Sequence, residues 1–187
     1  MDSGEPSLKD DPLEFEANMF IDRDPITGLL KTWACESSLK VLKLMVTGIP
    51  RPDLEGDKVL EEVYPGEGRK IQSQVYDRIA RLTNLETSCL AYEEAAYLNN
   101  PMQWSCVEMS LESGLDKLSG LKALKELGVS CMRTKIGLKE VQWMTEQWPR
   151  LRAIYYLGMW NDMDLDDERR AAVQWLKKHH PEILLRF

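Results

Sequence analysis

The sequence predicts an α/β fold of the leucine-rich-repeat type: a solenoid segment of short parallel strands alternating with helices, with irregular repeats and insertions. Two observations support this prediction. Apolar stretches with the spacing L-x-x-L-x-L recur along the chain, and stretches with helical apolar periodicity lie between them. A short strand and a helix cannot each bury an apolar side alone, so such units stack and share one core.

The strand-like stretches share one apolar frame. The third, LSGLKALKELGVSCM, is the fullest, and HPEILLRF supplies a last strand around residues 183–185. In the second stretch a serine takes one apolar position. Positions in the frame are Leu39, Leu42 and Leu44; Leu82, Leu85, Ser88 and Leu90; Leu118, Leu121, Leu124, Leu127 and Val129; Leu151 and Ile154.

Equivalent leucines are spaced unevenly. Leu39, Leu85, Leu124 and Leu151 follow one another at intervals of 46, 39 and 27 residues. Only the last interval lies in the usual range of about 20 to 29 residues. The longer intervals predict insertions at residues 51–69 and 91–106, which are rich in turn residues and acids.

Four stretches between the strands have helical periodicity. They cover residues 69–82, 106–121, 138–148 and about 165–179. The last begins after Asp164, an expected N-cap, and has acids in its first turn and lysines in its last, which suits the helix dipole. Pro149 and Pro181 stand where helices should already have ended.

Composition places the chain among ordinary globular proteins. It has 187 residues, 43% of them hydrophobic and 29% charged, which suits one domain. We expect a flexible acidic tail over residues 1–24 and a repeat domain over residues 25–187. The net charge of −7 disfavours nucleic acid and anionic membranes as partners. The four widely spaced cysteines, the lack of an apolar membrane span and the lack of a secretory signal predict a cytoplasmic or nuclear protein.

No pattern in the sequence favours catalysis, a metal or a cofactor, so we expect a protein that is not an enzyme. The only histidines, His179 and His180, are adjacent and do not have metal-ligand spacing. PGEGRK lacks the remaining residues of a phosphate-binding loop. The acids around Asp162 lack the glycine and glutamate of a calcium loop, so helix capping explains them better.

The residues between the inward leucines predict a partner-binding face. Side chains alternate along a strand, so these residues should line the exposed concave sheet. They form a mixed-charge face, which suits a protein surface better than a small apolar ligand, although such a face can also be simply solvated. The predicted partner-binding residues are Lys40, Val41, Lys43, Glu86, Thr87, Lys125, Glu126, Arg152 and Tyr155.

Several longer strings are similar to a known family. YPGEGRKIQSQVYDRIARLTNLE, LESGLDKLSGLKALKEL and VQWMTEQWPRL, followed by AVQWLKKHHPEI, resemble the C-terminal leucine-rich region of fungal F-box/leucine-rich-repeat-like proteins over residues 30–187. The resemblance implies a repeat domain that binds substrates for a ubiquitin ligase built from a Skp1-type adaptor, a cullin and an F-box protein.

The chain departs from this family at its N-terminal end. The segment ahead of the first repeat-like stretch is shorter than an F-box, so a Skp1-type adaptor is an expected partner only of a longer form that has one. The alternative hypothesis is a stand-alone leucine-rich-repeat scaffold or inhibitor-like protein with no link to ubiquitin.

Overall fold

The computed structural model describes residues 14–49, 66–90, 107–129, 135–155, 157 and 167–186. Several sequence-based expectations lie outside these ranges. They concern residues 1–13, most of both insertions, the cysteines at 106 and 131, and the acids at 162 and 164.

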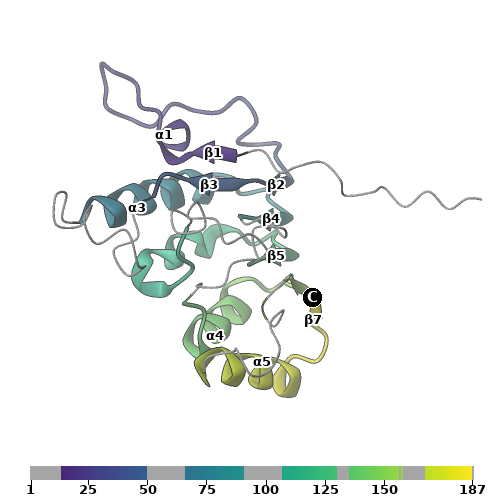
Figure 1. The fold of residues 1–187 in the computed structure, drawn as a ribbon. Helices are drawn as coiled ribbons and strands as arrows, with labels where there is room; N and C mark the ends of the chain where they lie inside the picture. The colour runs from purple at the N-terminus through teal and green to yellow at the C-terminus, as the bar shows by residue number, and fades with distance from the viewer. Residues whose placement is uncertain are drawn as a thin grey trace, which may run out of the picture.

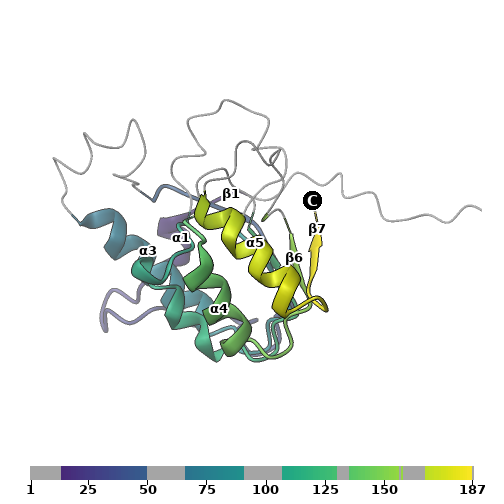
Figure 2. The same ribbon diagram turned by 90° about the horizontal axis from the view of Figure 1, so that it is seen from below.

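A five-stranded parallel sheet runs through the described residues, and the spatial order of its strands is their order in the chain. Helices α3, α4 and α5 lie on one side of this sheet in Figure 1 and again in the view from below in Figure 2. The α/β part of the predicted fold class is therefore confirmed, as is a parallel sheet. The strands are β2 (Val41–Lys43), β4 (Thr87–Cys89), β5 (Glu126–Gly128), β6 (Ala153–Tyr155) and β7 (Leu184–Arg186).

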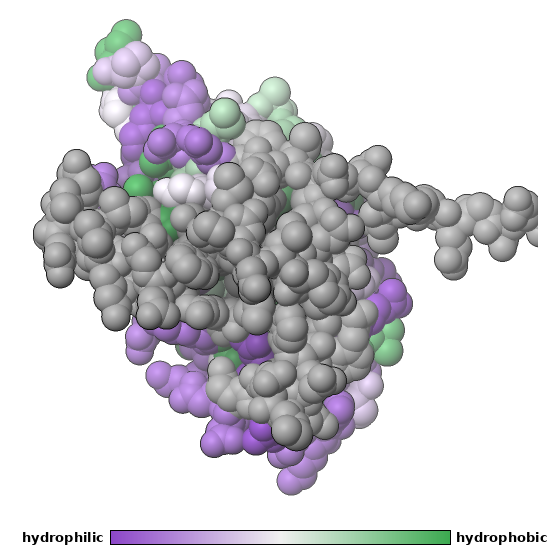
Figure 3. Space-filling model, viewed as in Figure 1, coloured by the Kyte–Doolittle hydropathy of each residue, from purple (hydrophilic) through white to green (hydrophobic). Residues whose placement is uncertain are grey.

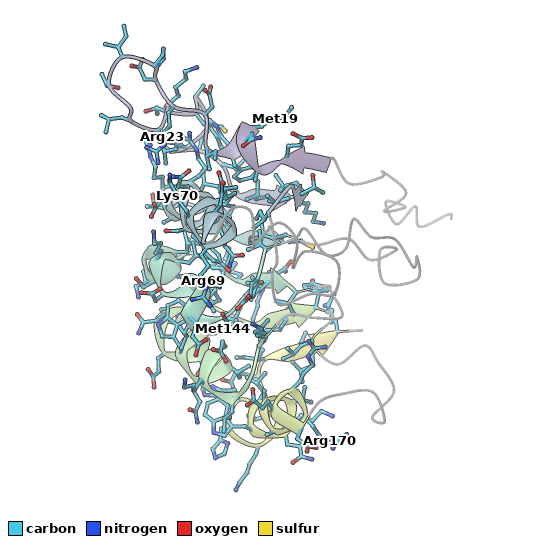
Figure 4. The ribbon with its side chains drawn as sticks, turned by 60° about the vertical axis from the view of Figure 1, so that its left-hand side comes forward. Met19, Arg23, Arg69, Lys70, Met144 and Arg170 are labelled. Atoms are coloured by element: carbon cyan, nitrogen blue, oxygen red, sulfur yellow. The ribbon has the colours of Figure 1, made fainter. Side chains whose placement is uncertain are left out.

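The strands pair without a shift in register, so the middle residues of all five lie in one row. Leu42, Ser88, Leu127 and Ile154 of this row are buried, and Leu185 is half-buried. Helical side chains pack from the same side; Met144 of α4, for example, is buried and lies between the helix and the strands (Figure 4). The L-x-x-L-x-L frame therefore predicts the inward positions correctly, including the one held by serine.

Three of the four expected helical stretches are α-helices: α3 (Glu67–Ala80), α4 (Leu138–Gln147) and α5 (Asp167–His179). The remaining expected stretch is described over residues 107–121. It contains two 3-10 segments instead, η3 (Leu111–Ser113) and η4 (Leu115–Gly120). Gly114 between them has a φ of 101°, a left-handed conformation that interrupts a right-handed helix. The leucines still face inward, because Leu115 and Leu118 are buried.

Residues 14–24 differ from the tail expected over residues 1–24. They form β1 (Glu14–Glu16) and the single helical turn α1 (Ala17–Phe20), and β1 pairs in parallel with β3 (Met45–Thr47). Ala17 and Phe20 are buried in the core. These few apolar residues are too short a run to show a period in the sequence, so only the three-dimensional packing identifies them as part of the fold.

A single residue, Leu44, separates β2 from β3. The extended segment from Val41 to Thr47 therefore pairs twice: its first half with β4 and its second half with β1 (Figure 1). The backbone N–H of Leu44 continues the ladder by donating to the carbonyl of Cys89 at 3.0 Å. This arrangement attaches the N-terminal elements β1 and α1 to the end of the five-stranded sheet.

Polar side chains connect neighbouring segments inside the fold. The Gln72 amide exchanges two hydrogen bonds with the backbone of Glu108, at 2.8 and 3.0 Å, and the Trp148 indole donates to the Leu118 carbonyl at 3.0 Å. The buried carboxylate of Glu140 accepts from the backbone N–H of Gly137 at 3.0 Å and of Leu111 at 3.3 Å. Buried backbone groups outside regular structure are satisfied in this way.

Candidate functional site

Five of the nine predicted partner-binding residues lie on the face of the sheet that points away from the helices, and the other four lie in the row just before the strands. On β2, Val41 and Lys43 are exposed while Leu42 between them is buried, as expected for alternating side chains. We call this face the sheet surface and define it by the nine predicted residues together with three more that the register places beside them. The three additional residues are Cys89, Leu184 and Arg186.

The first row of the sheet surface lies just before the strands. Backbone hydrogen bonds from Glu86 to Lys40, from Lys125 to Glu86 and from Arg152 to Lys125 place these four residues side by side. The Glu86 carboxylate binds the ammonium of Lys125 and lies 3.3 Å from that of Lys40. Hydrogen bonds from Lys125, and then from Lys40, hold the pKa of Glu86 below its usual value.

A second carboxylate, that of Glu126, connects three strands. It accepts hydrogen bonds from the hydroxyl of Thr87 at 3.5 Å and from the hydroxyl of Tyr155 at 3.4 Å, and it lies 3.2 Å from the guanidinium of Arg152. The Tyr155 ring also packs against Arg186, whose Cζ lies 5.5 Å from the ring centroid. The polar groups of the sheet surface therefore form chains that run across the strands.

The row at the end of the strands contains Lys43, Cys89, Gly128, Tyr155 and Arg186. At its centre the residues are small and closely packed: a Cβ at Gly128 would lie 2.5 Å from the sulfur and 2.9 Å from the Cβ of Cys89. Its two ends are basic. Among the described residues, neither Lys43 nor Arg186 has an ion-pair partner.

The sheet surface is basic although the chain is acidic. It has five Lys or Arg (Lys40, Lys43, Lys125, Arg152, Arg186) and two Glu, so its net charge is +3, against −7 for the whole sequence. The described residues together contain 20 Lys and Arg and 17 Asp and Glu, which leaves 4 and 14 for the rest of the chain. The excess acid therefore belongs to segments outside the described fold, and a partner at the sheet surface meets positive charge.

The sequence singled out most of this site but not all of it. Leu184 and Arg186 were missed because they belong to the site only through their pairing with β6, and register is not visible in one strand alone. Cys89 follows the framed position Ser88, so the alternation of the strand was a usable signal for it.

The adjacent histidines and the PGEGRK string were also considered as sites from the sequence. His179 and His180 lie at the end of α5, where their Nδ1 atoms are 3.0 Å from the Trp175 carbonyl and the Glu182 carboxylate, respectively. Residues 67–70 of the PGEGRK string form the first turn of α3. Within the described ranges, no three His, Cys, Asp or Glu side chains gather as metal ligands would.

Apolar side chains are exposed on the loop between α1 and β2. Ile26 and Leu29 lie there, and Figure 3 shows apolar atoms at the tip of this projection. Asp24 holds the loop by accepting hydrogen bonds from the backbone of Ile26 and Thr27 at 3.0 and 2.7 Å. These bonds lower the pKa of Asp24.

No family model, no curated protein and no solved structure matches the chain. Of the helices in the described ranges, none is both long enough and apolar enough to span a bilayer.

Proposed function

We propose that this chain is a leucine-rich-repeat solenoid segment that works as a non-catalytic protein-interaction module through its sheet surface. The supporting observation is the alignment of the nine predicted residues across four strands that come from separate parts of the sequence. Sequential parallel strands with one buried middle row are what stacked strand-and-helix units produce.

The shape and chemistry of the sheet surface favour a protein over a small molecule. Five strands about 4.8 Å apart give a surface about 19 Å wide, with charged, aromatic and apolar side chains exposed together. Small-molecule sites are instead clefts or cavities that bury most of the ligand and are lined mainly by apolar side chains. Arg and Tyr, which are enriched at protein interfaces, both occur here.

For the cellular role we propose, from the resemblance, the substrate-binding repeat region of an F-box-type ubiquitin-ligase receptor. A Skp1-type adaptor is then a partner only where a longer form supplies the F-box. A stand-alone scaffold or inhibitor-like protein in the cytoplasm or nucleus is the second candidate. Co-purification with the adaptor, from cells expressing the natural gene with an affinity tag, separates the two: the receptor retains the adaptor and the scaffold does not.

The interaction function is tested by affinity capture with two matched variants. Thr87→Arg places a large side chain in the middle of the sheet surface, and Gln174→Arg makes the same charge change at an exposed position on α5. We expect proteins captured by the wild type and by Gln174→Arg to be lost with Thr87→Arg, while circular dichroism shows all three folded. Equal capture by both variants would contradict the proposal.

A further inference from the structure

We propose that the partner of the sheet surface is an acidic polypeptide segment that presents apolar residues and Asp or Glu on the same side of an extended chain. This inference rests on the proposed function and specifies the chemistry of the partner. The first support is the net charge of +3 on the sheet surface within a chain of −7, which makes this face electrostatically complementary to a negative partner.

The second support is the arrangement of side chains at the two ends of the sheet. Val41 and Leu184 share one register position and are 51% and 52% exposed, and Lys43 and Arg186 share the position two residues on. Each end therefore presents one apolar and one basic side chain on the same face. An acidic partner with an apolar neighbour beside its carboxylate fits either end.

The distance between these ends sets the length of the partner. Four strand spacings of about 4.8 Å separate β2 from β7, which is about 19 Å. An extended segment covers this distance in about six residues, since each residue rises about 3.3 Å. A segment of six to eight residues that crosses the strands reaches both ends of the sheet surface.

The two glutamates of the sheet surface do not prevent this binding. Glu86 and Glu126 already accept hydrogen bonds from basic or hydroxyl groups of the same surface. The side chains of Lys40 and Arg152, which pair with them, are still 68% and 65% exposed. Ammonium and guanidinium groups have several donors each, so these two can also bind a partner carboxylate.

A protein segment fits this face better than nucleic acid does. Three of the five Lys and Arg side chains on the sheet surface already pair with its two glutamates. A long phosphate backbone binds through the neutralisation of many phosphates, which so small a group of cations does not provide. The exposed Val41 and Leu184 also favour a ligand with apolar side chains.

The test uses short labelled peptides and the full chain. Fluorescence anisotropy measures binding of an eight-residue peptide in which pairs of Leu alternate with pairs of Glu, so that each side of the extended chain carries both. The same pattern of Leu and Lys and a short DNA duplex are the comparison probes. The Lys43→Ala/Arg186→Ala variant removes the two basic side chains of the sheet surface that have no ion-pair partner in the described part of the chain. Lys177→Ala/Lys178→Ala removes the same charge from exposed positions on α5 and is the matched control.

We expect the Leu-Glu peptide to bind the wild type and the control equally, and the Lys43→Ala/Arg186→Ala variant about tenfold more weakly, since two charge contacts are lost. High salt should weaken binding. The proposal is overturned by no binding of this peptide, by an equal loss in the control, or by tighter binding of the duplex. Salt-sensitive self-association that the same double variant abolishes would also overturn it, because a second copy would then be the occupant.

The capture experiment separates failure of this inference from failure of the proposed function. Partners lost with Thr87→Arg but retained by Lys43→Ala/Arg186→Ala would keep the interaction function and reject an acidic partner. Partners retained by both variants would reject the sheet surface altogether.

Discussion

Replacement of Arg78 should destabilise the protein more than any other single loss of charge in the described fold. This side chain of α3 is fully buried and joins the helix to the N-terminal elements. Its guanidinium donates to the carbonyl of Phe20 at 2.9 Å and to the carboxylate of Glu36 at 2.7 Å, and it also binds the carbonyl of Lys31. It stacks on Trp33, with Cζ 4.8 Å from the ring centroid.

Arg78→Ala should lower the free energy of unfolding by about 3 to 5 kcal/mol, the usual cost of removing one member of a buried ion pair. The carboxylate of Glu36 would lose its closest cationic partner, and the carbonyls of Phe20 and Lys31 would each lose a donor. Urea denaturation followed by circular dichroism measures this loss. Hydrogen exchange of the backbone amides of β1 and α1 reports whether the N-terminal elements detach before the rest unfolds.

Arg81→Ala is the matched control, because Arg81 binds the same carboxylate at 3.1 Å but is 37% exposed. We expect it to cost about 1 kcal/mol or less. The double variant Arg78→Met/Glu36→Leu should recover much of the loss, since an apolar pair of similar volume can replace a buried ion pair. The reasoning is refuted if Arg78→Ala costs no more than Arg81→Ala.

Three further predictions concern packing and pH. Trp148→Phe should cost about 1 to 3 kcal/mol in urea denaturation, because the buried carbonyl of Leu118 loses its donor; a loss below about 0.5 kcal/mol would contradict this. Gly128→Ala should cost about 1 to 3 kcal/mol by crowding Cys89, and Cys89→Ala in the same chain should restore part of it; no recovery would show that the sulfur is not the obstacle. The pKa of Glu86 is lowered from 4.5 by folding, so its contribution is present above pH 4.5 and is lost as the pH falls through the lowered pKa. Glu86→Gln should therefore differ from the wild type near neutral pH and converge with it in acid, and a constant difference would contradict the assignment.

The buried positions of the strands were predictable from the sequence, because residues on one buried face recur at a regular spacing along the chain. Leu42, Leu127 and Ile154 are buried as the frame predicts, and so is Ser88. The 3-10 segments around Gly114 were not predictable from the same pattern, because inward leucines at three- and four-residue steps fit either helix type.

The buried ion pair was missed for a different reason. Arg78 stands three residues after Val75 and four before Leu82, which places it on the apolar side of α3. That position was a signal for burial. Its partner Glu36, however, lies 42 residues away in a segment without periodicity, and only tertiary packing brings the two together.

The net charge of the whole chain does not reveal the positive charge of the sheet surface. A sum over the chain gives −7, whereas a partner meets only the charges on the face that it approaches. The nine residues predicted from the sequence already hold four Lys or Arg against two Glu, and the register adds Arg186, which raises their net charge from +2 to +3.

The double pairing of the Val41–Thr47 segment has a consequence for how the molecule opens. An array in which each segment contacts mainly its neighbours loses structure from its ends inward. At the N-terminal end, β1 cannot separate without disturbing the strand that also begins the five-stranded sheet, and Arg78 fastens the adjoining residues to α3. At the other end, β7 pairs only with β6 among the described strands, and Leu184 is exposed. Amide protons should therefore exchange with solvent first in β7. A partner bound at Tyr155 and Arg186 should slow this exchange more than a partner bound elsewhere on the sheet surface.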